Sequence, residues 1–259
     1  IVSVKTEMGS NKEIPVVGAK YKLVAVDEIK GKTEVGEYIT DKLGKIVVEG
    51  LPKGQYYLEE VKAPEGYIKD DKNIDLDLSN KDHGDIVEVE HENEKIPHIK
   101  TTAEDKNTGK KNINPTKKVY IKDYAYYKDL IIGKEYEIKG LLMDKSTNKP
   151  LLDKNGRKYE TSLKFVPETR NGYVVLEFEV DSSDVRGKTT VVFEDLYREG
   201  RLLYSHADIN DEDQTVKVKD PKIKTTFAEI KSGKKVFDPV GVVKLVDKVY
   251  YENLVIGDE

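Results

Sequence analysis

An uncharged amide stands among apolar residues at the end of an acidic stretch, YSHADINDEDQTVKV (204–218). Side chains two residues apart share a face of a strand, so Gln214, Val216 and Val218 point the same way. A buried amide is costly unless another group satisfies it. We therefore expect Gln214 to meet a polar partner inside a core. His206 precedes it closely enough to return across the loop.

The partner of this amide should be a nucleophile on a neighbouring strand. Thr101 shares its face with the apolar Ile99 and Ala103, whereas Thr102 lies on the opposite, charged face. Thr101 is the favoured nucleophile and Thr102 is the alternative. Inward-facing threonines are also common in ordinary strands, and a lone histidine is usually structural.

Two carboxyls, Asp123 and Glu194, share faces with apolar residues on further predicted strands. A hydroxyl, a histidine and two carboxyls around an amide form a self-acylation site. His206 can accept the Thr101 proton, as a histidine activates a serine nucleophile. Two close carboxylates repel, so one should stay protonated and polarise the Gln214 carbonyl. Loss of ammonia would leave a Thr–Gln ester, formed once per chain as a folding step rather than an enzyme activity.

A second set of residues, Lys5, Glu60 and Asn93, could react in a similar way. Glu60 shares a face with Tyr56 and Leu58, and Asn93 ends the last strand of its segment, whereas the direction of Lys5 is less secure. In an apolar interior an amine and an acid can both be neutral. The amine can then attack the Asn amide with loss of ammonia, joining first and last strands by an isopeptide bond. The ordinary alternative is a solvated Lys, an exposed Glu and a turn Asn.

The elements that must position these side chains are short strands. Hydrophobic residues form 37% of the 259 residues and charged residues 36%, which favours thin β-sandwiches over a wide α/β enzyme. No cysteine is present, so a cross-link in such thin cores would have to be something other than a disulfide. One helical turn fits residues 181–185. The predicted strands are 2–6, 20–26, 36–40, 45–48, 55–61, 85–91, 98–103, 118–123, 135–143, 173–180, 189–196 and 214–218.

The chain divides into three predicted segments: 1–96, 97–220 and 221–259. The third repeats the start of the second without a gap, since PKIKTTF echoes PHIKTTA and LVDKVYYENLVIGDE echoes IKDYAYYKDLIIGKE. Thr225 and Asp247 occupy the places of Thr101 and Asp123, but this partial copy has no Glu, His or Gln counterpart. The predicted fold class is all-β, with tandem immunoglobulin-like β-sandwich domains.

The motifs resemble two known families. VKTE, PVVGAKYKL, YYLEEVKAPEGY and VEVEHENEK resemble, in that order, the collagen-adhesin B-type (SpaA-like, prealbumin-like) domains of Gram-positive surface proteins. That resemblance implies an isopeptide bond between Lys5 and Asn93 with Glu60 as the catalytic residue. I-x-T-T-A, D-x-x-x-Y-x-x-L, V-V-F-E and H-x-D-x-x-D-x-x-Q-T resemble the ester-bond-forming T-Q domains (VaFE repeats) of Gram-positive adhesins. One departure is Ala125, where the repeat has Val249.

These resemblances imply a stalk segment of a cell-wall-anchored adhesin outside the cell. Its partners would be neighbouring stalk domains of the same chain, with a host surface ligand bound by a tip domain that this sequence lacks. No pilin-type lysine motif is evident, which favours a single-chain adhesin over a shaft pilin. Alternatives are a host protein- or glycan-binding module using Tyr124, Tyr126 and Tyr127, and a carbohydrate-active enzyme using Asp123 and Glu194.

Other function classes receive little support from the sequence. The net charge of -5 is mixed along the chain without a basic stripe, which disfavours nucleic-acid binding. No apolar run is long enough to span a bilayer. The acidic run 208–213 lacks the glycine and distal glutamate of a calcium loop, so we expect a solvated loop and no metal or cofactor.

Overall fold

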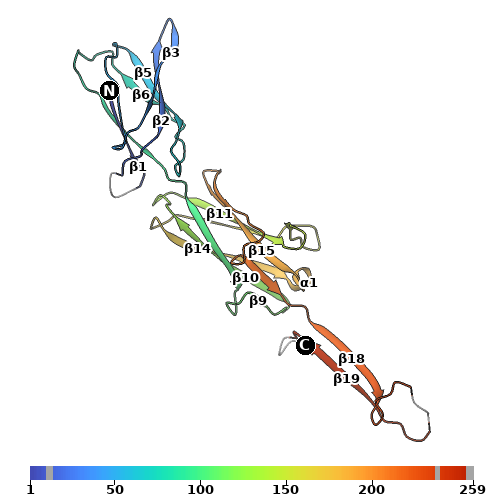
Figure 1. Cartoon of the computed structure of the whole chain (residues 1–259). Helices are drawn as coiled ribbons and strands as arrows, with labels where there is room; N and C mark the ends of the chain where they lie inside the picture. The colour runs from blue at the N-terminus through green and yellow to red at the C-terminus, as the bar shows by residue number, and fades with distance from the viewer. Residues whose placement is uncertain (10–13, 237–239, 255–259) are drawn as a thin grey trace. The chain divides into compact units, whose positions relative to one another are not determined.

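The computed structural model describes residues 1–9, 14–236 and 240–254 (Figure 1). Strands dominate it, and the predicted all-β fold class is confirmed. Two compact units are present: residues 1–98 with 129–134 and 168–170, and residues 99–128, 135–167 and 171–259. Among the described residues, no helix is both long and apolar enough to cross a membrane.

The first unit is a sandwich of two sheets, with strand orders β4-β1-β7 and β3-β2-β5-β6. The first strand pairs in parallel with the last, so that Lys5 lies opposite His91 and Glu7 opposite Asn93. The other strand pairs described in this unit are antiparallel. The strands are β1 (Val2–Glu7), β2 (Lys20–Asp27), β3 (Gly31–Ile39), β4 (Lys45–Val47), β5 (Gln55–Lys62), β6 (Ile74–Asp77) and β7 (Glu88–Asn93).

The core of this unit is small and lies between the two sheets. It consists of buried aliphatic residues and two tyrosines from the inner faces: Val16, Ala19, Tyr21, Leu23, Ile46, Val48, Tyr56, Leu58, Leu76 and Leu78. On β1 the usual alternation is inverted, because the polar residues Ser3, Lys5 and Glu7 face inward while Val2 and Val4 are half-buried. The interior beside β1 is therefore polar.

A glycine fixes the backbone next to Lys5. The Lys5 N–H donates to the carbonyl of Gly44 at 2.9 Å, and the Val16 N–H donates to the carbonyl of Lys5 at 3.0 Å. Gly44 has φ +70°, and a Cβ added there would collide with the Lys5 carbonyl oxygen. Only glycine allows both this backbone conformation and this close approach.

The second unit contains a larger sandwich. One sheet has the order β14-β10-β8, and the other has β12-β11-β15-β17-β9, with β13 paired to β11 and β16 to β15. Its elements are β8 (His98–Asp105), β9 (Asn112–Ile113), β10 (Lys118–Lys128), β11 (Tyr136–Asp144), β12 (Lys149–Pro150), β13 (Glu160–Phe165), β14 (Gly172–Asp181), α1 (Ser182–Val185), β15 (Thr189–Arg198), β16 (Arg201–His206) and β17 (Thr215–Val218). The single predicted helical turn corresponds to α1, whose N-cap is Asp181.

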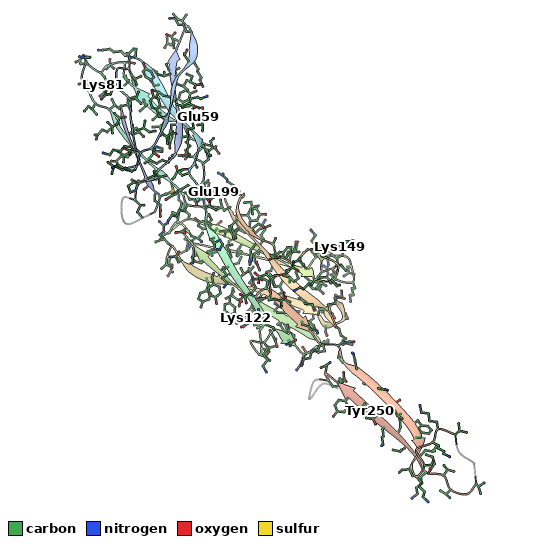
Figure 2. All side chains as sticks on the ribbon, in the orientation of Figure 1. Glu59, Lys81, Lys122, Lys149, Glu199 and Tyr250 are labelled. Carbon is green, nitrogen blue, oxygen red and sulfur yellow. The ribbon has the colours of Figure 1, made fainter. Side chains whose placement is uncertain are left out.

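The inner faces of this sandwich alternate as a period of two requires. On β10 every second residue from Val119 to Tyr127 is buried, while Lys122 projects from the outer face (Figure 2). Gly140 on β11 brings its backbone close to the facing sheet, because an added Cβ would lie 2.8 Å from Leu176 and Phe178 side chains. The sheets thus pack closely around an interior that also holds buried polar groups.

The repeat segment forms a hairpin of β18 (Lys222–Glu229) and β19 (Leu245–Glu252). Within the described residues, β18 pairs only with β19. Most of its side chains are exposed, including the labelled Tyr250 (Figure 2). Outside the repeat hairpin, the strands that the sequence did not predict are β6, β9, β12, β13 and β16, all short or flanking a longer partner.

Candidate cross-linking sites

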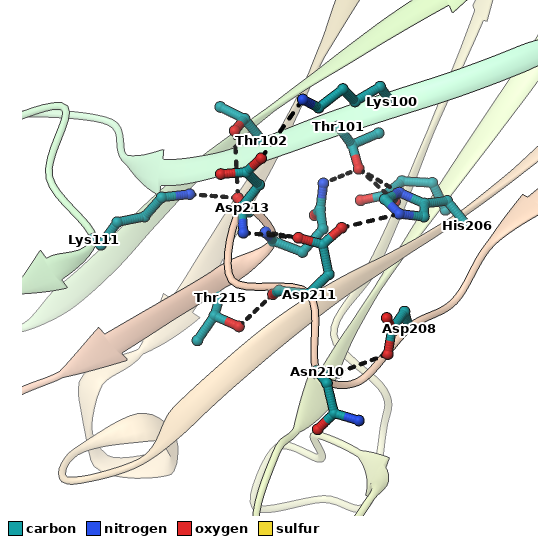
Figure 3. Close-up of polar contacts among 12 residues, drawn as sticks. Lys100, Thr101, Thr102, Lys111, His206, Asp208, Asn210, Asp211, Asp213 and Thr215 are labelled. Carbon is teal, nitrogen blue, oxygen red and sulfur yellow. Dashed lines mark hydrogen bonds and ion pairs between the residues drawn. The ribbon is translucent and has the colours of Figure 1, made fainter.

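Gln214 is held between the two sheets of the second unit. The carbonyl before it, on Asp213, accepts the Ala103 N–H of β8 at 2.9 Å, and its own carbonyl accepts the Val192 N–H of β15 at 3.2 Å. Lys111 also donates to the Asp213 carbonyl (Figure 3). The Gln214 side chain is 1% exposed and points inward, on the same side as Val216 and Val218.

The Thr101 hydroxyl meets this amide directly. The Gln214 Nε2–H donates to Thr101 Oγ1, and the same oxygen lies 2.7 Å from His206 Nδ1 (Figure 3). Thr101 is 1% exposed. Thr102 projects to the other face, where its hydroxyl lies 3.4 Å from the Asp213 carbonyl. The structure thus brings together Thr101, His206 and Gln214, and places Thr102 outside the group.

Asp211 completes this group, and the sequence reasoning did not include it among the reacting residues. His206 Nε2 lies 3.1 Å from Asp211 Oδ2. With Nε2–H donating to this carboxylate, Nδ1 is left as the acceptor for the Thr101 proton. Asp211 Oδ1 also accepts the Asp213 N–H at 2.7 Å, which orders the turn before Gln214. Its position between His206 and Gln214 in sequence was the available signal.

Both predicted carboxyls lie in the same interior. Glu194 is the cross-strand neighbour of His206, and its Oε2 lies 3.2 Å from the Thr101 hydroxyl oxygen. Burial raises the pKa of Glu194 to about 8. Burial, followed by the negative charge of Glu194, raises the pKa of Asp123 well above its ordinary value. Both causes favour the protonated form of Asp123, as expected for one member of a close carboxyl pair.

The amide oxygen is available for activation. Gln214 Oε1, both oxygens of Asp123 and Glu194 Oε1 are buried without a hydrogen-bond partner among the described residues. A protonated carboxyl here can donate to the carbonyl that the Thr101 oxygen attacks. The constellation is hence chemically suited to acyl transfer from the amide to the hydroxyl.

In the first unit, Lys5 is fully buried and surrounded by polar groups. Its Nζ lies 3.5 Å from Glu60 Oε1 and 3.0 Å from His91 Nδ1, and it also contacts the Tyr21 hydroxyl. Burial lowers the Lys5 pKa to about 8, although the charge of Glu60 opposes this shift. About a tenth of the amine is therefore neutral at pH 7. Lys5 faces inward, whereas Val2 and Val4 on the other face of the strand are half-buried.

Glu60 connects the amine to the amide. The same Oε1 that approaches Lys5 accepts a hydrogen bond from Asn93 Nδ2 at 3.1 Å, while Oε2 accepts the Asp70 N–H at 2.6 Å. Asn93 Nδ2 also lies 3.3 Å from the Ile68 carbonyl. Asn93 Oδ1 is buried without a partner among the described residues. The structure brings all three predicted residues, Lys5, Glu60 and Asn93, into one buried group.

The repeat hairpin carries no comparable group. Thr225 on β18 and Asp247 on β19 are exposed. In the described part of the chain, no set of three or more acidic, His or Cys side chains is arranged to hold a metal ion. The acidic turn instead orders itself, for example through the Asn210 N–H, which donates to Asp208 Oδ1 at 2.9 Å (Figure 3).

The fold and these centres define a class of tandem β-sandwich domains with buried residues suited to self-reaction. The chain belongs to the family of T-Q ester bond containing domains, whose model matches residues 97–218 and again 221–259. The model of the prealbumin-like fold domain matches residues 3–95. Both resemblances read from the motifs are confirmed. These families consist of structural domains rather than enzymes.

Similar folds occur among solved structures. The major pilin subunit of Bacillus cereus is 18% identical, covering 98% of this chain and 82% of that chain, with a TM-score of 0.52. This similarity shows the fold alone. A Mobiluncus mulieris adhesin containing intramolecular disulfide, isopeptide and ester bond cross-links is 14% identical over 60% of this chain and 76% of that chain, with a TM-score of 0.41. No curated protein sequence matches this chain.

Proposed function

We propose that this chain is a stalk segment of a Gram-positive surface adhesin, exported and anchored to the cell wall, whose domains lock themselves with internal covalent bonds. The ester joins Thr101 to Gln214, and the isopeptide bond joins Lys5 to Asn93. The observation that carries the proposal is the contact of Thr101 Oγ1 with both His206 Nδ1 and the Gln214 amide. The family membership supports the ester, and the prealbumin-like match supports the isopeptide bond.

In the ester reaction, His206 removes the Thr101 proton while the oxygen attacks the Gln214 side-chain carbonyl. Asp211 holds the imidazole in the required tautomer and stabilises the imidazolium. The protonated Asp123, with Glu194, neutralises the charge that develops on the amide oxygen. His206 then delivers the proton to the departing nitrogen. The C–N bond breaks, the C–O bond forms, and one ammonia leaves.

In the isopeptide reaction, Glu60 Oε1 stands between nucleophile and leaving group. It lies 3.5 Å from Lys5 Nζ and 3.1 Å from Asn93 Nδ2, so one oxygen can take the amine proton and pass it to the amide nitrogen. The new Nζ–Cγ bond replaces the Cγ–Nδ2 bond of Asn93. One ammonia leaves, and Glu60 returns to its starting state.

Intact-mass measurement of the denatured chain tests the proposal. We expect a deficit of two ammonias relative to the sequence mass, of which Gln214→Ala restores one and Glu60→Ala the other. Protease digestion should recover the two linked peptide pairs. If the wild-type chain has its full sequence mass, neither bond forms. If both variants abolish the same linked peptide pair, the assignment of residues to the two bonds is wrong.

A binding role has one supporting observation. Tyr124, Tyr126 and Tyr173 form an aromatic cluster on the outer face of β10 and β14, with centroids 5.7–6.4 Å apart. Tyr126 is 46% exposed and Tyr173 58%. Tyr127, expected from the sequence to join such a surface, is instead buried against Phe165. Binding to a glycan array that is lost in Tyr126→Ala would support this second function.

A further inference from the structure

His91 lies beside Lys5, the nucleophile of the first unit, and has no role in the isopeptide reaction described above. In the parallel register of β1 and β7 it is the residue directly opposite Lys5. Its Nδ1 is 3.0 Å from Lys5 Nζ, and its ring packs edge-on against Tyr21 with centroids 5.2 Å apart. The contact joins an imidazole nitrogen to the one atom that must attack.

The surroundings keep this imidazole neutral. Burial, followed by the charge of Lys5, lowers the His91 pKa to about 3. The titratable groups facing the pair are Tyr21 from β2 and Glu60 from β5, with Asp70 acting on Lys5 at longer range. Burial raises the Tyr21 pKa, so its hydroxyl also stays neutral. His91 Nδ1 is therefore an uncharged acceptor aimed at the amine.

We propose that His91 is a further catalytic residue of the isopeptide reaction, whose neutral Nδ1 accepts a hydrogen bond from the attacking Lys5 amine. This inference rests on the proposed Lys5–Asn93 bond. Positive charge develops on Nζ as it attacks the amide carbon, and an acceptor already in place stabilises that charge without reorganisation. His91 also fixes the direction of the amine, which lies at the end of a long, flexible side chain.

His91 does not carry the proton away. An imidazole with so low a pKa is a poor base for an ammonium, whereas Glu60 Oε1 reaches both Lys5 and Asn93. The proton lost by Nζ therefore travels through Glu60 to the departing ammonia, and His91 leaves the reaction unchanged. With Nδ1 accepting, its proton sits on Nε2, which is buried and has no partner among the described residues.

The test is the rate of bond formation in the full chain carrying Gln214→Ala, so that Asn93 is the sole source of lost ammonia. Unreacted protein recovered from inclusion bodies in denaturant is refolded by dilution between about pH 5 and 9, quenched at intervals and weighed by mass spectrometry. His91→Phe keeps an aromatic ring without an acceptor, and His91→Gln keeps an acceptor. His83→Phe, at an exposed histidine of the same unit, is the matched control.

We expect His91→Phe to react roughly 10- to 100-fold more slowly at its plateau, since a hydrogen bond to a charged group is lost in the transition state. Removing the acceptor also destabilises the Lys5 ammonium, so the rising limb of the pH profile should move to lower pH. His91→Gln should recover part of the rate, and His83→Phe should match the parent.

A purely packing role for His91 predicts the opposite pH shift. A loosened pocket admits water and moves the rising limb of His91→Phe to higher pH, an outcome that would overturn the inference, as would an unchanged rate or the absence of recovery in His91→Gln. If circular dichroism shows His91→Phe unfolded, His91→Leu replaces it as the acceptor-free variant. If the parent itself never forms the bond, the proposed isopeptide fails, independently of His91.

Discussion

Replacing Thr101 by valine should remove the ester while preserving the shape of the core. Valine replaces the hydroxyl by a methyl group at a site that is 1% exposed, so little repacking is needed. Thr102→Val is the matched control, because Thr102 is the next residue on β8 and its side chain faces away from Gln214. We expect the mass deficit of Thr101→Val to be smaller by one ammonia than that of the wild-type chain, and the deficit of Thr102→Val to be unchanged.

The loss of stability follows from the size of the closed loop. Thr101 and Gln214 are separated by 113 residues. In the chain-entropy description of a cross-link, closing a loop of that length stabilises the folded state by about 5 kcal/mol. In Thr101→Val the Gln214 amide also stays unreacted in the core without the Thr101 oxygen as its acceptor, which costs about 1–3 kcal/mol more. The transition of this unit should therefore fall by roughly 15–25 °C.

Differential scanning calorimetry of the full chain can resolve this change. The transition of the first unit should stay in place, whereas that of the second should move in Thr101→Val alone. Thr101→Ser retains a hydroxyl and should still form the ester. If Thr101→Val shows the same mass deficit as the wild-type chain, Thr101 is not the nucleophile. If only Thr102→Val loses one ammonia of that deficit, the reaction belongs to Thr102.

Three further outcomes are expected. Asp211→Asn keeps an oxygen that can accept the Asp213 N–H but removes the negative charge beside His206. Ester formation should therefore slow roughly 100-fold or more in time-resolved mass measurements. Because the Glu194 pKa is raised from 4.5 to about 8, folding favours its protonated form. In Thr101→Val, stability should thus be fully present below about pH 4.5 and fall by up to about 4 kcal/mol by pH 8 in denaturant titrations; an increase with pH would contradict the assignment. Gly44→Ala should destabilise the first unit by roughly 2–3 kcal/mol in thermal unfolding and delay Lys5 cross-linking, because its Cβ displaces the Lys5 carbonyl.

The two-residue period of side chains along strands predicted much of the architecture and most members of both reactive groups. Gln214, Thr101 and Glu60 each sit on a face with apolar neighbours, and the two-residue period is enough to place them inward. The same rule was weakest for Lys5. The polar face of β1 is the buried one, because a buried group on another strand pairs with its lysine, as Glu60 of β5 does with Lys5.

Other features depend on contacts that no local pattern encodes. β16 flanks a longer strand and shows no clear apolar alternation. β13 does alternate, but only over six residues and without a fully buried face. Asp211 looked like one acid among several in a solvated turn, and only the position of His206 distinguishes it. His91 lies beside Lys5 only because β7, the last strand of the domain, pairs in parallel with β1, the first.

That parallel pairing also sets how a load would pass through the first unit. When the two ends of such a domain are pulled apart, neighbouring parallel strands slide along each other, and all their ladder bonds resist together. A covalent link between Lys5 and Asn93 would carry the tension directly from β1 to β7. The intervening chain, roughly 300 Å if extended, would stay folded, so the domain would behave as an inextensible rod instead of a spring.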